Sequence, residues 1–136
     1  MGLVIDTDVL ILAERGGRWL DFSAWQEHGD AFVSAVTTSE LLVGVHRARS
    51  DAQRARRTAY VEGILAALPV LPFDLETARV HAHLIASLPA NESIGAHDAL
   101  IAATALRHGF PVLTGNSRDF RKLAGVMVFD YPRPET

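Results

Sequence analysis

The sequence has no cysteine, and Lys122 is its only lysine among 13 lysine and arginine residues. The absence of cysteine excludes disulfides, thiolate metal ligands and cysteine nucleophiles, and it fits the cytoplasmic location that we expect. No apolar run is long enough to cross a bilayer, and the first residues lack the basic segment and cleavage site of a signal peptide. We therefore predict that the protein does not associate with a membrane.

The formal net charge of −3 gives the chain no general attraction to nucleic acid. Any such binding has to come from a local basic patch or from bound cations. The length of 136 residues and the hydrophobic fraction of 49% predict one globular domain, covering residues 1–136, with a substantial core.

Short apolar runs alternate with segments of helical periodicity along the whole chain. The runs predict strands at 2–6, 31–37, 69–73, 110–116 and 126–131. The periodic segments predict helices at 8–17, 18–29, 37–48, 50–68, 74–88, 96–109 and 117–125. This alternation is typical of an α/β sandwich with a mainly parallel sheet, in which ligands bind beyond the carboxyl ends of the strands.

The run LVIDTDVLI places two carboxylates, Asp6 and Asp8, where the first predicted strand ends. Turn chemistry is one explanation, and a metal site is a second. A third is a phosphate-accepting nucleophile, because an apolar run followed by D-x-D also resembles the opening motif of haloacid-dehalogenase-type phosphatases.

Further polar residues are expected at the same edge of the sheet. Glu40 and Asp98 lie in the first turns of two predicted helices, and an apolar segment follows Asp98. Acidic residues are common in a first turn because they complement the helix dipole, so Glu40 alone has an equally good structural explanation. The fourth strand ends in LTGN, which adds Thr114 and Asn116, and Asp119 follows one helical turn later.

Carboxylates gathered in one site repel one another, and without a cation some of their pKa values would rise. A divalent cation reverses this effect, and ligands that are all oxygen favour Mg²⁺ or Mn²⁺. Because Mg²⁺ keeps waters and accepts phosphate oxygens, the expected substrate is a phosphate ester or a phosphodiester.

Four segments in this order, LVIDTDVLI, TTSELLVGV, IGAHDALIAATA and LTGNSRDF, resemble the motifs of PIN-domain ribonucleases, and most of all the VapC-type toxins of bacterial toxin–antitoxin pairs. The resemblance covers nearly the whole chain. It implies a three-layer α/β/α fold with a five-stranded parallel sheet. It also implies endonucleolytic cleavage of RNA that depends on Mg²⁺ or Mn²⁺.

The resemblance also implies a role for each motif residue. Asp6 and Asp98 would hold the metal, and Glu40 would orient or deprotonate the attacking water or ligate a second ion. Asn116 stands where the family often has aspartate, and with Thr114 it would support waters and the scissile phosphate. No covalent intermediate is needed.

Two supporting residues, Asp119 and Asp8, have more than one possible role. Asp119 is the alternative to Asn116 as the fourth polar position. Asp8 is expected to cap a helix or to support the metal ligands from behind.

Two other functions compete with the ribonuclease. A phosphatase would make Asp6 the nucleophile and Asp8 the general acid, but it needs a lysine at a strand end, and Lys122 lies inside a predicted helix. A non-catalytic binding module would keep the fold and tolerate the loss of Asp6 or Asp98, and both are present.

The resemblance implies several partners: an RNA substrate, a cognate antitoxin protein, and a second copy in a homodimer that joins the antitoxin in a hetero-oligomer. A basic helix is either a solvated face or an RNA track, formed by Arg54, Arg56 and Arg57. Three aromatic residues are either core or anchors for a helical antitoxin segment, namely Trp19, Phe22 and Trp25.

Overall fold

The computed structural model describes residues 1–17 and 21–132. Its strands are β1 (Gly2–Ile5), β2 (Asp30–Ser34), β3 (Val70–Leu71), β4 (Val112–Thr114) and β5 (Val128–Asp130). They form one sheet in the order β3-β2-β1-β4-β5, and every neighbouring pair is parallel. The predicted five-stranded, mainly parallel sheet is therefore confirmed, and it is parallel throughout.

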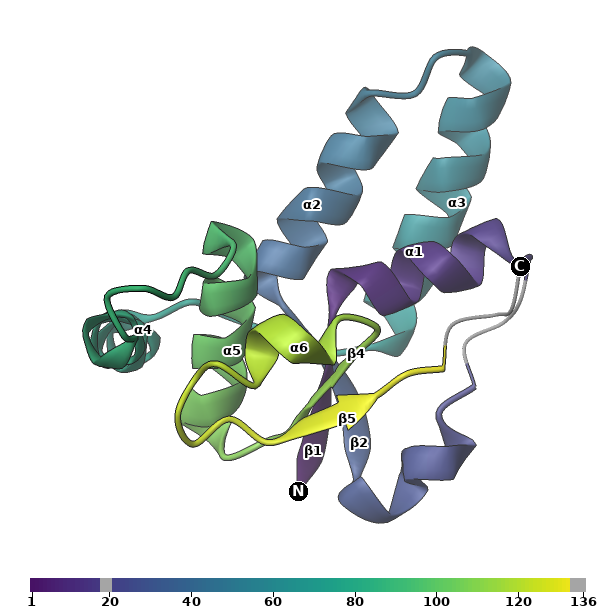
Figure 1. Ribbon diagram of the computed structural model, residues 1–136. Coiled ribbons are helices and arrows are strands. Elements are labelled where there is room, and N and C mark those ends of the chain that lie inside the picture. The colour runs from purple at the N-terminus through teal and green to yellow at the C-terminus, as the bar shows by residue number, and fades with distance from the viewer. Residues whose placement is uncertain (18–20, 133–136) are drawn as a thin grey trace.

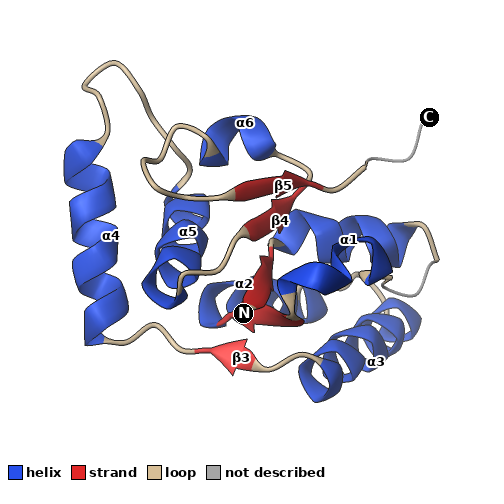
Figure 2. Cartoon of the chain, turned by 90° about the horizontal axis from the view of Figure 1, so that it is seen from below, coloured by secondary structure: helices blue, strands red, loops and turns tan. Residues whose placement is uncertain are grey.

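Helices cover both faces of the sheet. They are α1 (Thr7–Arg15), α2 (Ala35–His46), α3 (Asp51–Ala67), α4 (Leu75–Ser87), α5 (Ala96–His108) and α6 (Ser117–Phe120). Figure 2 shows α4 and α5 on one side of the strands and α1 and α3 on the other, which confirms the three-layer sandwich. The hairpin of α2 and α3 extends beyond the sheet (Figure 1). Within the described ranges, no helix is long and apolar enough to span a membrane.

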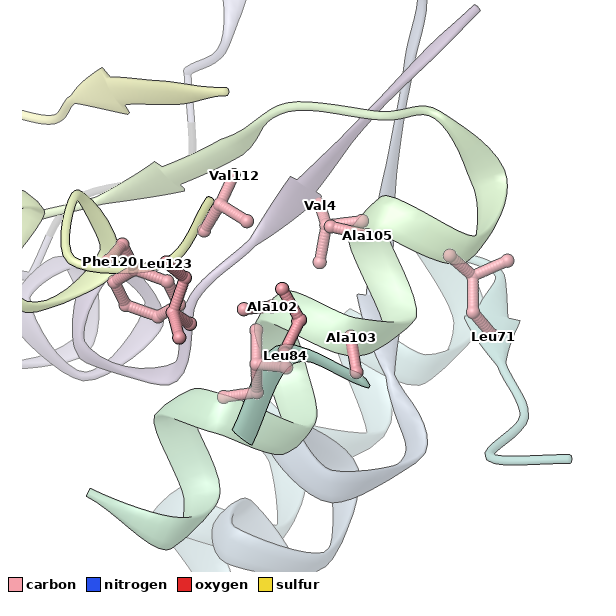
Figure 3. Packing of buried hydrophobic residues seen from close by; sticks show 10 residues of the cluster. Val4, Leu71, Leu84, Ala102, Ala103, Ala105, Val112, Phe120 and Leu123 are labelled. Carbon is pink, nitrogen blue, oxygen red and sulfur yellow. The ribbon is translucent and has the colours of Figure 1, made fainter. Parts of the chain in front are cut away.

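The first strand shows how one apolar run builds two cores. Leu3 and Ile5 join the core formed with α1, α2 and α3, whereas Val4 joins the core formed with α4 and α5 (Figure 3). Successive side chains of a strand point to opposite faces, so a strand that is covered on both faces is apolar at every position. All three side chains are buried.

Small side chains let α5 pack closely in the centre of the molecule. Ala99, Ala102, Ala103 and Ala105 are all buried there. The helix ends at Gly109, whose φ of 71° lies in the left-handed region that glycine adopts without a Cβ clash. This close packing brings the first turn of α5 near the edge of the sheet.

A side-chain cap starts α2 two residues earlier than predicted. Ser34 accepts a hydrogen bond from the backbone N–H of Thr37, so α2 begins at Ala35. Glu40 therefore lies in the second turn, and its predicted place in the first turn is wrong. The helix dipole no longer explains Glu40, because that effect falls off within the first turn.

Two predicted helices are shorter in the structure. The segment predicted as helix 18–29 contains a 3₁₀ helix, Ser23–His28, and residues 18–20 lie outside the described part. The predicted helix 117–125 ends at Phe120, because the N–H groups of Lys122 and Leu123 bond to the carbonyls three residues before them. The chain thereby tightens into turns that bury Leu123.

The substitution Phe120→Ala tests the core below α6. Phe120 is fully buried and is the largest side chain of its core. Its removal leaves a cavity, so we expect a loss of about 3–5 kcal/mol in the free energy of unfolding measured by urea titration. Met127→Ala is the control, since Met127 is exposed. Equal effects of the two substitutions would contradict this assignment of the core.

Candidate active site

The candidate site lies at the carboxyl edge of the sheet, beside the central strand β1, which pairs with both β2 and β4. Open parallel sheets bind ligands outside the strand ends where the strand order reverses. A cavity of about 180 Å³ opens at this point, and its lining consists of Asp6, Thr7, Asp8, Ile11, Glu40, Asp98 and Asn116. The structure thus brings together five predicted site residues from four separate motifs.

Asp6 is the most deeply placed of these carboxylates, with a relative exposure of 3%. It ends β1 and caps α1, accepting a hydrogen bond of 2.8 Å from the Thr7 backbone N–H. Its other oxygen accepts a bond of 2.7 Å from the hydroxyl of Thr114 at the end of β4. Burial, and then the charge of Asp8, raise the pKa of Asp6 to about 8.

Glu40 is held from two sides. Its Oε1 accepts a hydrogen bond of 2.8 Å from the Thr7 hydroxyl, and its Oε2 lies 3.2 Å from Nδ1 of His97. These contacts join α1, α2 and α5 across the cavity. Neither Thr7 nor His97 had a predicted role, and His97 occupies the first turn of α5, within the helix predicted at 96–109.

A chain of buried hydroxyl groups leads to Glu40. The Oγ atoms of Thr7 and Thr37 are 3.0 Å apart, and those of Thr37 and Ser34 are 3.2 Å apart. Thr7 has one hydroxyl hydrogen, which the Glu40 carboxylate requires because it can only accept. Thr37 must then donate to Thr7, and Ser34 to Thr37. The donors therefore all run toward Glu40 and fix its carboxylate in one orientation.

Asp98, the third acidic residue, is half-buried at the start of α5. Burial contributes most to raising its pKa, followed by the charges of Asp119, Asp8 and Glu40, while His97 lowers it. These influences show that Asp98 belongs electrostatically to the same cluster as the other cavity carboxylates.

Asn116 and Asp119 occupy different depths. Asn116 lines the cavity, whereas Asp119 is absent from the lining and accepts a hydrogen bond of 3.0 Å from the Asn116 amide nitrogen. Thr114 also lies behind the lining, where it accepts a bond of 2.9 Å from the Asn116 backbone N–H. Of the two alternatives for the fourth polar position, Asn116 is the one that faces the cavity.

Asp8 does not cap a helix, because Asp6 is the residue that caps α1. Asp8 accepts a hydrogen bond of 3.2 Å from the backbone N–H of Gly115 and also forms a side-chain hydrogen bond with Asp6. Of the two roles predicted for Asp8, the helix cap is wrong, and support of the metal ligands from behind stays a prediction. Asp8 lies in the cavity lining, where it ties α1 to the loop after β4.

The polar side chains that line the cavity have the chemistry that a hard divalent cation prefers. Among residues 1–17 and 21–132, no three histidine, aspartate or glutamate side chains already form a group that could hold a metal ion. The polar side chains of the cavity nevertheless offer only carboxylate, hydroxyl and amide groups. Burial, followed by the charges of neighbouring carboxylates, raises the pKa values of Asp6 and Asp98, and a bound cation would offset this effect. The assignment of Asp6, Asp98 and Glu40 as ligands therefore stays a prediction.

A second, larger cleft of about 430 Å³ adjoins the site between α1, α2 and α3. Its lining shares Ile11 and Glu40 with the smaller cavity and carries three arginines, Arg15, Arg56 and Arg57. Arg15, in the last turn of α1, was not expected from the sequence, because its neighbours α2 and α3 are distant in the chain.

The predicted basic track divides into different environments. Arg54 bonds to Asp51 and to the Ala48 carbonyl and does not line the cleft. Arg57 donates a hydrogen bond of 2.7 Å to the Gly44 carbonyl.

The aromatic residues of the N-terminal half have core contacts. Phe22 and Trp25 pack against the core below α1, and the Trp25 ring stacks on Tyr131 at 5.7 Å between centroids. Trp19 lies outside the described residues.

Comparison with known proteins identifies the class that this fold and site define. The family model of the PIN domain matches residues 3–126, and the chain therefore belongs to the PIN domain family.

Within that family the chain groups with the VapC ribonucleases. It is 38% identical over 129 residues to Ribonuclease VapC1 of Rickettsia felis, covering 94% of this chain and 95% of the relative. It superimposes on the structure of VapBC2 from Rickettsia felis bound to a promoter DNA fragment with a TM-score of 0.83, at 17% identity and coverage of 97% and 100%. VapBC-5 from Mycobacterium tuberculosis, of a toxin–antitoxin family, gives a TM-score of 0.74 at 29% identity and coverage of 95% and 96%. The predicted family resemblance is confirmed.

The pKa of Asp6 predicts how stability depends on pH without a metal. The ordinary pKa of an aspartate is 3.8, and the pKa of Asp6 in the fold is about 8. The protonated carboxyl group therefore stabilises the fold fully below about pH 3.8, and this stabilisation is lost as the pH rises through about 8. When the pH is raised from 5 to 9 in buffer with a chelator, the free energy of unfolding should fall less for Asp6→Asn than for the wild type. The difference should be roughly 1 kcal/mol or more. Urea titrations across this range measure the difference.

Asp30→Asn is the control, because Asp30 is exposed at the start of β2, away from the cavity. It should keep the pH dependence of the wild type. A parallel pH dependence of Asp6→Asn and the wild type would show that Asp6 ionises freely in the fold.

Proposed function

We propose that this protein is an endoribonuclease that depends on Mg²⁺ or Mn²⁺ and acts as the toxin of a toxin–antitoxin pair. The observation that carries the proposal is the convergence of Asp6, Glu40, Asp98 and Asn116 on one cavity. Support comes from relatives named as VapC ribonucleases and from a structural neighbour of a toxin–antitoxin family.

Each carboxylate of the cavity has its own proposed part in the reaction. A bound divalent cation would supply an activated water and stabilise charge on the phosphate during displacement. Asp6 and Asp98 are the carboxylates that we assign to holding it. Glu40, fixed by Thr7, would orient the attacking water and accept its proton.

Asn116 can support this reaction as a donor and as an acceptor. One of its two amide hydrogens is donated to Asp119, so the second hydrogen and the amide oxygen remain for the cavity. These groups suit waters and the scissile phosphate. Thr114 acts one step further back by donating to Asp6.

The phosphatase alternative gains no support from the site. Lys122 follows α6 in a turn and does not end a strand.

The cleft between α1, α2 and α3 is the path that we propose for the RNA strand. Arg15 and Arg56 are exposed on its walls, and Arg57 is partly buried there. Because the cleft shares Glu40 with the catalytic cavity, a backbone that follows these arginines reaches the site. Arg54 contributes less in this proposal, since it lies outside the lining.

The proposed protein partners are a cognate antitoxin and a second copy of this chain. Solved relatives named VapBC support the antitoxin. The homodimer follows from the family resemblance. Phe22 and Trp25 would contribute to partner binding only through their exposed edges, since both pack against the core.

The first test of this proposal removes single carboxylates from the cavity. Asp6→Asn and Asp98→Asn should each reduce Mg²⁺-dependent cleavage of total RNA by a hundredfold or more, roughly the effect of losing a metal-positioned water. Asp51→Asn is the matched control, because Asp51 forms only a surface pair with Arg54. Unchanged cleavage by either cavity variant, with all variants purified to the same standard, would refute the site assignment.

The second test addresses the RNA path. In an Asp98→Asn background that does not cut, Arg56→Gln should weaken RNA binding and reduce the slope of log K against log salt by about 0.7. Fluorescence anisotropy at several salt concentrations measures both quantities. Arg79→Gln, on the surface of α4 beside Glu76, is the control. Identical slopes for the two arginine variants would remove Arg56 from the path.

A further inference from the structure

The only lysine of the chain connects two segments that border the catalytic cavity. Lys122 Nζ donates a hydrogen bond of 3.1 Å to the Ser93 carbonyl, and it lies 3.2 Å from Asp119 Oδ1 and 3.6 Å from Glu92 Oε2. An ammonium group has three hydrogens, and three acceptors surround this one. The side chain is 26% exposed, so these contacts are partly shielded from water.

The first arm of this contact reaches the cavity through Asp119. One oxygen of Asp119 faces Lys122, and the other accepts the amide hydrogen bond of Asn116. The bonds from Asn116 and then Lys122 hold the pKa of Asp119 below its usual range, so the carboxylate stays a strong acceptor. Lys122 therefore fixes the group that orients the Asn116 amide.

The second arm reaches the start of α5. Glu92 and Ser93 belong to the 88–95 loop, which leads directly into the helix that carries Asp98. The N-cap of α5 is Gly95, which provides no side-chain hydrogen bond, so this first turn depends on contacts with other elements, among them the contact of His97 with Glu40. Figure 1 shows α6 beside α5, which lets a residue after α6 hold the loop.

From these contacts we propose that Lys122 is a positioning residue, which sets Asn116 and the first turn of α5 in register so that Asn116 and Asp98 face the same cavity. The catalytic consequence of this role rests on the proposed ribonuclease function. The contacts themselves do not depend on it, and they can be tested on the metal-free protein.

Positioning and simple charge effects predict opposite results for metal binding. Removing a positive charge beside a carboxylate cluster would by itself attract a cation more strongly. Loss of register would weaken cation binding, because ligands that are held in place by outer contacts bind more tightly. We therefore expect Lys122→Met to weaken Mn²⁺ binding about tenfold, despite the more negative protein.

Three variants of the full chain provide the experiment. Lys122→Met removes both arms, and Lys122→Arg keeps the charge and the donors. Arg121→Met is the matched control, because Arg121 is the neighbouring residue and pairs at 3.1 Å with Asp130, away from the cavity. Hydrogen exchange of the metal-free protein reports the 88–95 loop and the start of α5, and electron paramagnetic resonance of free Mn²⁺ reports binding.

Lys122→Met should exchange faster than the wild type in the 88–95 loop and the first turn of α5, while Lys122→Arg and Arg121→Met should not. With RNA, Lys122→Met should lower kcat by about tenfold to a hundredfold with little change in KM, and Lys122→Arg should restore most of it. Unchanged exchange, equal changes in both methionine variants, or Mn²⁺ binding that is equal or tighter would overturn the proposal. A wild-type protein that binds Mn²⁺ but cuts no RNA would defeat the ribonuclease proposal, while exchange and Mn²⁺ binding would still decide the role of Lys122.

Discussion

The burial of the Asp6 carboxylate beside other carboxylates is the constraint on which the rest of this site depends. Asp6 is almost wholly buried, and its pKa of about 8 arises first from burial and then from the neighbouring charge of Asp8. The chain offsets part of this cost with donors aimed at the carboxylates, such as the Thr7 N–H and the Thr114 hydroxyl. These donors come from different elements, so the carboxylates are tolerated together only in the closed fold.

Much of the fold was predictable, because its signals are local. Continuous apolar runs predict strands that are covered on both faces. Asp6 and Asp98 could be predicted as site residues because they lie at a strand end and at a helix start. The start of α2 was not predictable, because the segment from Ala31 to Thr37 suits a strand and a helix equally well. The boundary is set where pairing with β3 ends and Ser34 becomes a cap, which is a tertiary event.

Long-range partners explain what else the sequence did not reveal. Arg57 looked like part of an open basic face, yet its guanidinium holds the Gly44 carbonyl 13 positions away. Lys122 looked like a helical surface residue, and it instead joins the 88–95 loop to Asp119. In both cases the side chain is long and charged, so its partner depends on which loops the fold brings near, and local periodicity carries no record of that.

Depth in the cavity separates the environments of Asp6 and Glu40, and with them the roles that we propose for the two residues. Asp6 is almost wholly buried, and burial, followed by the charge of Asp8, raises its pKa to about 8, so without a cation its uncharged form is favoured and it is poorly suited to act as a base. Glu40 has a side chain that is 28% exposed, and it receives the last donor of the hydroxyl chain from Thr7. A carboxylate in that position can take a proton from a water in the cavity and release it to solvent. The deep carboxylate therefore suits a ligand whose ionisation follows cation binding, and the shallow one suits the base, because their environments differ although their chemistry is the same.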